Sequence, residues 1–131
     1  EISLASAYGK SPFFEFYISD FEMILRKMHK FLFDLNWEIH EKLVEQIGLD
    51  TIVTLTNRFE HDPPKTIDLR DAIRPKSDDE QDLLFNAQPY SQVFEDRFGF
   101  LKNLSIIDLL FCYGPGSLAV LQQSAIKPTW S

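Results

Sequence analysis

Two helical patterns of apolar residues, separated by a tight turn, fill residues 89–115. The first pattern is followed by Gly99, whose freedom to adopt positive φ suits the end of a helix. Its large apolar side chains, at helical spacing, are Tyr90, Val93, Phe94 and Phe98. A short loop over residues 100–103 comes next. No other stretch is so strongly specified, so we expect the remaining segments to pack around it.

The second pattern has a clear start and a clear end. Ser105 is suited to accept a hydrogen bond from a free backbone N–H as an N-cap, and Asp108 places a negative charge near the positive end of the helix dipole. Gly114 ends this helix, and Pro115 prevents its continuation. A last helix is predicted over residues 117–123.

The N-terminal half contains further helix signals. Residues 2–8 have the apolar pattern of the tail of a helix that starts before the chain does, and Ser11-Pro12 is typical of a helix start. A second start at Ser19 or Asp20 leads into an apolar stripe made of Phe21, Ile24, Leu25, Met28 and Leu32. We expect this stripe to pack on residues 106–110.

Residues 36–48 predict one more helix, which Gly48 closes. Ile52–Thr56 is the one β-branched run and predicts a strand. Asp68 is expected to cap a short helix that reaches Ile73, before Pro75. Together these elements predict one domain over residues 1–131, mainly α, with a minor β element.

The amino-acid composition limits which class of protein this chain can be. Of 131 residues, 44% are hydrophobic and 12 are Phe, which predicts a helical domain with an aromatic core. The net charge of −7 argues against nucleic-acid binding, because phosphate affinity depends on clustered Lys and Arg. The same charge disfavours an anionic membrane surface, and no apolar run reaches the roughly 20 residues that span a bilayer.

Several motifs resemble the WbqC-like protein family. The resemblance runs from about Tyr8 to about Leu121, and the stretch near the end of the chain is similar to a C-terminal family signature. It is carried by Ser11-Pro12-Phe13-Phe14-Glu15, Asp68-Leu69-Arg70, Ile73, Pro75-Lys76, Pro89-Tyr90, Gln92-Val93-Phe94, Gly99-Phe100, Asn103-Leu104-Ser105-Ile106, Asp108-Leu109-Leu110-Phe111 and Gly114-Pro115. The resemblance implies that the chain is the C-terminal part of a larger α/β protein.

The resemblance also implies a cellular role. The family is associated with bacterial surface-polysaccharide (O-antigen) biosynthesis and has been suggested to include a transferase of an amino acid such as glycine. It has no established catalytic residues to carry over. A cytoplasmic enzyme that moves an amino acid or acyl group to a sugar or nucleotide-sugar is therefore one hypothesis. A non-enzymatic binding or assembly module is the other.

Polar residues inside the central stretch are candidates for ligand binding. Asn103, Ser105 and Asp108 are accounted for by capping of one helix. The alternative is that this helix N-terminus, next to Tyr90 and Gln92, holds a carboxylate or phosphate of a ligand. Both interpretations stay open at this stage.

A second candidate is basic. Arg70 and Arg74 are four residues apart on the predicted short helix, and Lys76 follows, so the three could bind an anionic small molecule. The alternative is that the arginines pair with nearby carboxylates such as Asp68.

Other chemistry is not indicated. No two of the three His share the spacing of a metal-binding helix, and no phosphate loop is present, so we expect neither a metal nor a cofactor. Cys112 lies among apolar residues and is expected to be buried and inert. We also expect Ile2, Leu4, Ala5 and an edge of Ile52–Thr56 to be uncovered, and hence self-association or binding of the absent N-terminal part.

Overall fold

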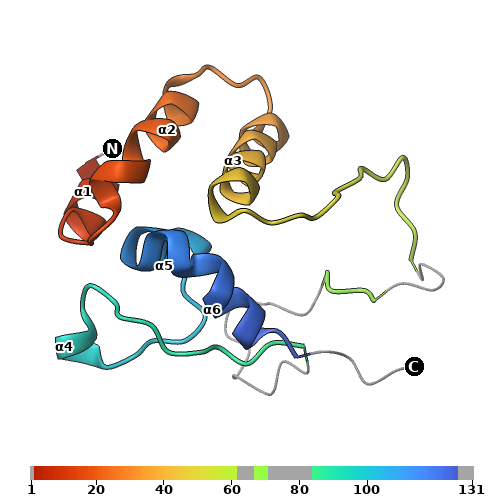
Figure 1. Ribbon diagram of the computed structural model, residues 1–131. Helices are drawn as coiled ribbons and strands as arrows, with labels where there is room; N and C mark the ends of the chain where they lie inside the picture. Colours follow the sequence, from red (N-terminus) through yellow and green to blue (C-terminus); the bar gives the residue numbers. More distant parts are fainter. Residues whose placement is uncertain (1, 62–66, 71–83, 127–131) are drawn as a thin grey trace.

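The computed structural model describes residues 2–61, 67–70 and 84–126, and their regular structure is almost entirely helical (Figure 1). A 3₁₀ turn, Gly114–Gly116, joins two of the helices. The helices in chain order are α1 (Ile2–Tyr8), α2 (Phe14–Arg26), α3 (Leu32–Ile47), α4 (Glu95–Phe98), α5 (Ile106–Tyr113) and α6 (Ser117–Ser124). Helix α5 contacts α2 on one side and α6 on the other, and α2 also packs on α3.

The core is built around the fully buried ring of Phe111 on α5. Three rings meet it in edge-to-face geometry: Tyr8 at 5.4 Å, Phe14 at 5.3 Å and Phe21 at 6.0 Å between centroids. Such pairs are favourable because the positive edge of one ring faces the negative face of the other. Phe111 therefore holds α1 and α2 against α5, and the predicted aromatic core is confirmed.

A backbone contact supplements this packing. The Phe13 N–H donates to the Phe111 carbonyl oxygen over 2.9 Å, so the chain before α2 lies directly on α5. At the end of α5, Gly114 has a φ of +56° and its α-carbon faces the Phe13 ring. A Cβ at this position would lie 2.6 Å from that ring, so both the conformation and the close approach require glycine.

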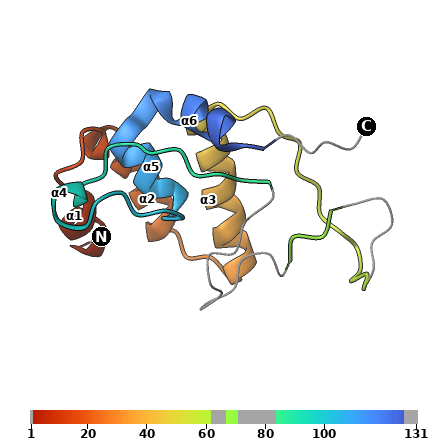
Figure 2. The same ribbon diagram turned by 90° about the horizontal axis from the view of Figure 1, so that it is seen from below.

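Helix α3 covers the other side of α2. Its one fully buried residue is Ile47, while Ile39 and Leu43 are partly buried against the core. Gly48, at φ 77°, ends the helix as predicted. The described residues that follow, 49–61, run away from the helices in both ribbon views (Figures 1 and 2).

The signals that start and end the helices near the centre of the chain are confirmed, but the first predicted helix is not: α4 covers only Glu95–Phe98, and Tyr90, Val93 and Phe94 lie before it in irregular structure or a turn. Ser105 caps α5 by accepting a hydrogen bond from the Ile107 N–H over 3.4 Å, and Asp108 lies in the first turn. Gly99 takes a positive φ of 67° after α4. These features depend on interactions within a few residues, which explains why the sequence reveals them.

Helix boundaries in the N-terminal half differ from the prediction. Helix α2 begins at Phe14 and is continuous to Arg26, because nothing between Ser19 and Asp20 interrupts it. The Ser11 hydroxyl donates to the Tyr8 carbonyl over 2.6 Å instead of capping α2.

Of the five residues of the predicted stripe, only Phe21 and Ile24 are buried. Leu25 is 43% exposed, Leu32 is 71% exposed and Met28 is fully exposed. Met28 lies beyond the end of α2 at Arg26, so the helical stripe does not continue to it.

Two further elements are wrong. Ile52–Thr56 is not a strand but an exposed irregular segment, and the β structure of the described residues is one antiparallel bridge between Phe85 and Ala125. Residues 68–70 are not helical; Asp68 instead accepts the Arg70 N–H over 3.0 Å in a local turn. Leu4, expected to be uncovered, packs against the core.

The contact between Gly114 and Phe13 gives a test of the fold. Gly114→Ala should lower the free energy of unfolding by about 2–5 kcal/mol, since positive φ costs about 1–2 kcal/mol and the overpacked ring adds about 1–3 kcal/mol. Gly99→Ala is the matched control: its φ is also positive and its ψ also lies outside the αL region, but nothing lies within 4 Å of the added Cβ. Urea denaturation of both variants measures the difference, and equal losses would show that Phe13 makes no steric demand.

Candidate functional site

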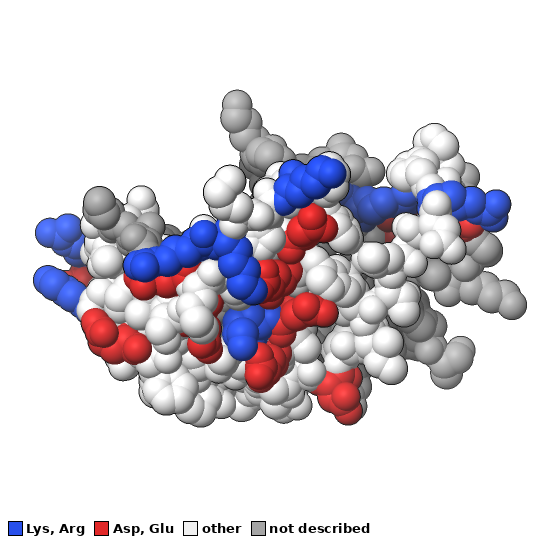
Figure 3. All heavy atoms as spheres, turned by 90° about the horizontal axis from the view of Figure 1, so that it is seen from above, with Lys and Arg blue, Asp and Glu red and all other residues white. Residues whose placement is uncertain are grey.

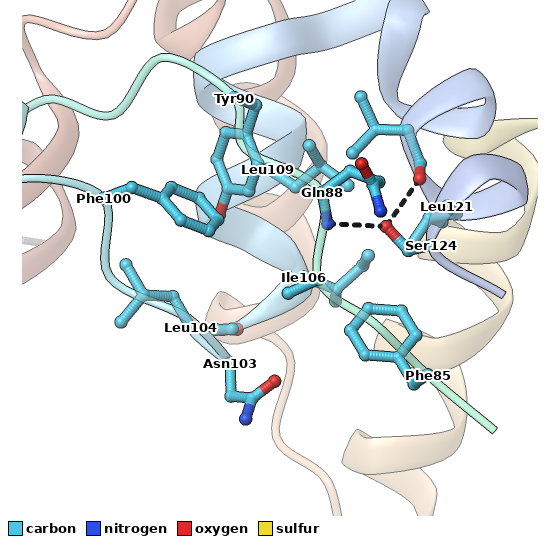
Figure 4. Close-up of a pocket in the computed structure, with 13 residues that line it drawn as sticks. Phe85, Gln88, Tyr90, Phe100, Asn103, Leu104, Ile106, Leu109, Leu121 and Ser124 are labelled. Carbon is cyan, nitrogen blue, oxygen red and sulfur yellow. Dashed lines mark hydrogen bonds between the residues drawn. The ribbon is translucent and has the colours of Figure 1, made fainter. Parts of the chain in front are cut away.

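A cavity of about 130 Å³ lies between residues 85–106 and helices α5 and α6 (Figure 4). Its wall is mostly apolar, and the polar side chains on it are few. The lining residues are Phe85, Ala87, Gln88, Tyr90, Phe100, Asn103, Leu104, Ser105, Ile106, Leu109, Val120, Leu121 and Ser124. A concave apolar wall with a few convergent polar groups is typical of a small-molecule site.

Hydrogen bonds to α6 fix one end of the segment that covers the cavity. The Asn86 N–H donates to the Ser124 carbonyl over 2.8 Å, and the Gln88 N–H donates to the Ser124 hydroxyl over 3.1 Å. That hydroxyl donates in turn to the Val120 carbonyl over 2.7 Å. The buried Ser124 thus connects α6 to residues 86–88 of the segment that covers the cavity.

The other end of the segment is held by Tyr90. Its hydroxyl donates to Oδ2 of Asp108 over 2.7 Å, and its ring meets Phe100 edge-to-face at 5.5 Å. In Figure 4 the hydroxyl end of Tyr90 points toward Phe100 and the space above Leu104 and Ile106. The phenol oxygen therefore stands between the cavity and the carboxylate.

Asp108 is the centre of a buried polar group that we call the Asp108 cluster: Tyr8, Tyr90, Asp108 and Cys112. Only 4% of Asp108 is exposed, and none of the described Lys, Arg or His residues forms an ion pair with it. Burial raises the pKa of both tyrosines, and the negative charge of Asp108 adds to that rise. Both phenols therefore stay protonated and act as donors at neutral pH.

Cys112 is buried, as predicted. Burial and, to a smaller extent, the charge of Asp108 raise the pKa of its thiol to about 11, against the opposing effect of a hydrogen bond from the Val93 backbone. At neutral pH the thiol is therefore protonated. A protonated thiol is a poor nucleophile, because the thiolate is the reactive form. Cys112 is thus unsuited to form a covalent intermediate.

The predicted site residues of the central stretch separate into two roles. Tyr90 and Asp108 meet, and Asn103 lines the same cavity, with a φ of 57° and a side chain that points away from Tyr90 in Figure 4. Gln92 lies beside this pair, since a hydrogen bond from its side chain opposes the rise in the pKa of Tyr90. Its Nε2 also donates to the Leu101 carbonyl over 2.8 Å, and its Oε1 accepts the Leu101 N–H over 2.9 Å. It closes the loop that contains α4.

The basic candidate lies apart from this cavity. Arg70 Nε donates to both carboxylate oxygens of Asp68 at 2.9 and 3.0 Å, and its terminal nitrogens donate to the carbonyls of Glu60 and His61 at 2.8 and 3.0 Å. These hydrogen bonds hold the pKa of Asp68 at about 2. Arg74 and Lys76 are outside the described residues, so the structure does not join the three.

Several charged side chains elsewhere on the surface pair with a neighbour of opposite charge. A groove of about 360 Å³ between α2 and α3 contains Glu38, which pairs with Lys27 and His29, and Glu45, whose carboxylate lies 2.6 Å from Lys42. Figure 3 likewise shows acidic and basic side chains next to one another on one face. Within the described ranges, no group of His, Cys, Asp or Glu could hold a metal ion, and no helix is both long and apolar enough to cross a membrane.

The sequence singles out Tyr90 and Asn103, which line the cavity, and Asp108, which Tyr90 contacts; their role as ligand-binding residues stays a prediction. Tyr8 carries only the signal of a helix end, although its ring lies on Phe111 and its pKa responds to Asp108. Ser124 carries only a weak signal, since it follows the apolar residues of the last predicted helix.

Comparison with known proteins identifies one family. The model of the WbqC-like protein family matches residues 2–77, which is more than half of the chain. The match lies in the N-terminal part of the chain and excludes the stretch from Pro89 to Pro115, so the interpretation of that stretch as a C-terminal family signature is not supported. No curated protein and no solved structure matches the chain.

The hydrogen bond between Tyr90 and Asp108 gives a stability test. Tyr90→Phe should lower the free energy of unfolding by about 1–3 kcal/mol, because it leaves a buried carboxylate oxygen without its donor. Tyr113→Phe is the control, since Tyr113 is 43% exposed and should change stability by less than about 0.5 kcal/mol. Urea denaturation compares the two, and equal effects would contradict the role given to the Tyr90 hydroxyl.

Proposed function

Because the chain belongs to the WbqC-like protein family, we propose that it acts in the cytoplasm in the biosynthesis of a bacterial surface polysaccharide of the O-antigen type. In this proposal it transfers an amino acid, such as glycine, or another acyl group to a sugar or a nucleotide-sugar. Membership of this family is the observation that supports a role in polysaccharide biosynthesis. The cavity beside the buried Tyr90–Asp108 pair is the observation that supports a reaction on a small molecule.

The geometry favours direct transfer over a covalent enzyme intermediate. In the proposed step a hydroxyl or amine of the sugar attacks the carbonyl carbon of an activated acyl donor. The new C–O or C–N bond forms while the bond to the leaving group breaks. A protonated Cys112 takes no part, because its pKa is about 11.

The Tyr90–Asp108 pair supplies a route for the proton that the acceptor loses. The phenol oxygen takes that proton as Tyr90 passes its own to Oδ2 of Asp108, across the 2.7 Å hydrogen bond. Positioned general bases contribute about 10²–10⁴-fold to rate. Asp108 would be the base and Tyr90 the group that contacts the acceptor.

An activity assay tests the proposal. The chain is incubated with nucleotide-sugars and a glycyl thioester, and mass spectrometry is used to look for a glycylated sugar. Asp108→Asn should reduce the rate by about 100-fold or more, because it removes the base. Cys112→Ala should keep the activity.

Two results would contradict this function. If none of the sugars tested gave a product, the proposed transferase activity would be contradicted. If a folded Cys112→Ala variant gave no product, transfer through a thioester on Cys112 would replace direct transfer. Circular dichroism of each variant confirms folding before the comparison.

One observation favours an assembly module as a second candidate. Large apolar side chains are exposed together where α2 ends and α3 begins: Met28, Phe31, Leu32 and Phe33. Ile52 and Leu55 are exposed as well, beyond the other end of α3. A contiguous exposed apolar patch such as that of Met28 and residues 31–33 is typical of a protein–protein interaction surface.

We propose that a second copy of the chain covers this surface. Light scattering should then give the mass of a dimer, and Phe31→Ser combined with Leu32→Ser should give a monomer with unchanged helicity. Asp96→Asn, an exposed site on α4, is the control and should remain dimeric. A monomer of the unsubstituted chain at high concentration would eliminate this candidate.

A further inference from the structure

We propose that the cavity beside α5 selects a small apolar group that carries a protonated amine, and that the amine binds at the Tyr90 hydroxyl above Asp108. This inference rests on the proposed function in one respect only: the cavity would hold the donor or the acceptor of the transfer. It adds to the proposed function the charge and the size of the group that the cavity binds.

Size and wall chemistry determine the apolar part. The cavity measures about 130 Å³ and is open to solvent beside Leu104, which is 42% exposed. An enclosed apolar cavity of about 150 Å³ binds benzene, so a group of that size is close to the upper limit here. Phe100, Leu104, Ile106 and Leu109 surround the space in Figure 4. A single ring or a short branched chain therefore fits, so a nucleotide-sugar could place only one such group inside the cavity.

The Tyr90 hydroxyl determines the polar part. It donates its one hydrogen to Asp108 and also receives a hydrogen bond from the Gln92 side chain, so the phenol oxygen offers a ligand only its remaining lone pair. A ligand group at this point must therefore donate a hydrogen bond. Ammonium, amine and hydroxyl groups meet that requirement, and a carboxylate or phosphate does not.

The negative charge of Asp108 then determines which of these donor groups binds most tightly. Asp108 is buried and, within the described part of the chain, has no cationic partner. Its field reaches across the Asp108 cluster, because it raises the pKa of Tyr8 and of Cys112 beyond the effect of burial. An ammonium group supplies the missing positive charge, whereas an anion is repelled.

The other polar side chains on the wall are engaged or turned away. The Ser105 hydroxyl accepts the Ile107 N–H as the N-cap of α5. The Ser124 hydroxyl already joins Val120 and Gln88, and the Gln88 side-chain amide donates to the Asn86 carbonyl over 3.2 Å. Asn103 points away from Tyr90. Recognition of the polar head is therefore assigned to Tyr90 and Asp108.

Three probes of equal size and different charge test the inference. Benzylamine, benzyl alcohol and benzoate are titrated into the ¹⁵N-labelled chain at neutral pH, and amide shifts of residues 85–109 report binding. Benzylamine should bind about tenfold more tightly than benzyl alcohol, because charge-assisted hydrogen bonds are roughly twice as strong as neutral ones. Benzoate should not bind.

Matched variants locate the effect. Asp108→Asn should remove the preference for benzylamine over benzyl alcohol, while Asp96→Asn, with the same change of net charge at an exposed site, should keep it. Ala87→Phe should abolish binding of all probes by filling the cavity. If Asp108→Asn does not fold, the order of the three probes on the unsubstituted chain still decides.

Binding of benzoate as tight as that of benzylamine, or unchanged binding in Ala87→Phe, would overturn the inference. So would the absence of binding by all three probes. The titration contains no acyl donor, so a failed transfer assay leaves its result intact. Conversely, glycyl transfer without selective amine binding would support the proposed function and reject this ligand class.

Discussion

The structure depends on the packing of one ring, that of Phe111, against three others. Tyr8, Phe14 and Phe21 come from two different helices and approach it edge-to-face, so the N-terminal chain is anchored on a helix about 100 residues later in the sequence. The hydrogen bond from the Phe13 N–H to the Phe111 carbonyl fixes the register of that contact. Removing the ring would therefore separate two halves of the domain, and not only create a void.

The same helix connects the core to the candidate site. Asp108 and Phe111 are three residues apart and Asp108 and Cys112 are four apart, so all three lie near one another on α5. Phe111 faces the aromatic core, and Asp108 is held by Tyr90 from the covering segment. A buried carboxylate without an ion pair is costly, and it is tolerated here because the first turn of the helix and a phenol donor stabilise it.

Local signals in the sequence were reliable, and signals that need a distant partner were not. Ser105, Gly99 and Gly48 act within a few residues of themselves, so capping and positive φ could be read directly. The β-branched run from Ile52 to Thr56 failed because strand preference expresses packing against a neighbour, and none of the described residues pairs with it. One contact of Gln92 could not be predicted for a similar reason. Its amide binds the Leu101 backbone, nine residues away, and no spacing rule predicts that contact.

Charge at the site cannot be inferred from the charge of the whole chain. The net charge of −7 suggests an acidic surface, yet the ion pairs on α2 and α3 are locally balanced, and Arg70 is held by Asp68. Exposed pairs of this kind are screened by solvent and exert little force at a distance. Asp108 differs because it is buried and lacks a counter-charge among the described residues, so its field is weakly screened where a ligand would enter. Discrimination between ligands of similar shape should therefore arise from this one carboxylate, through Tyr90, and not from the overall charge of the domain.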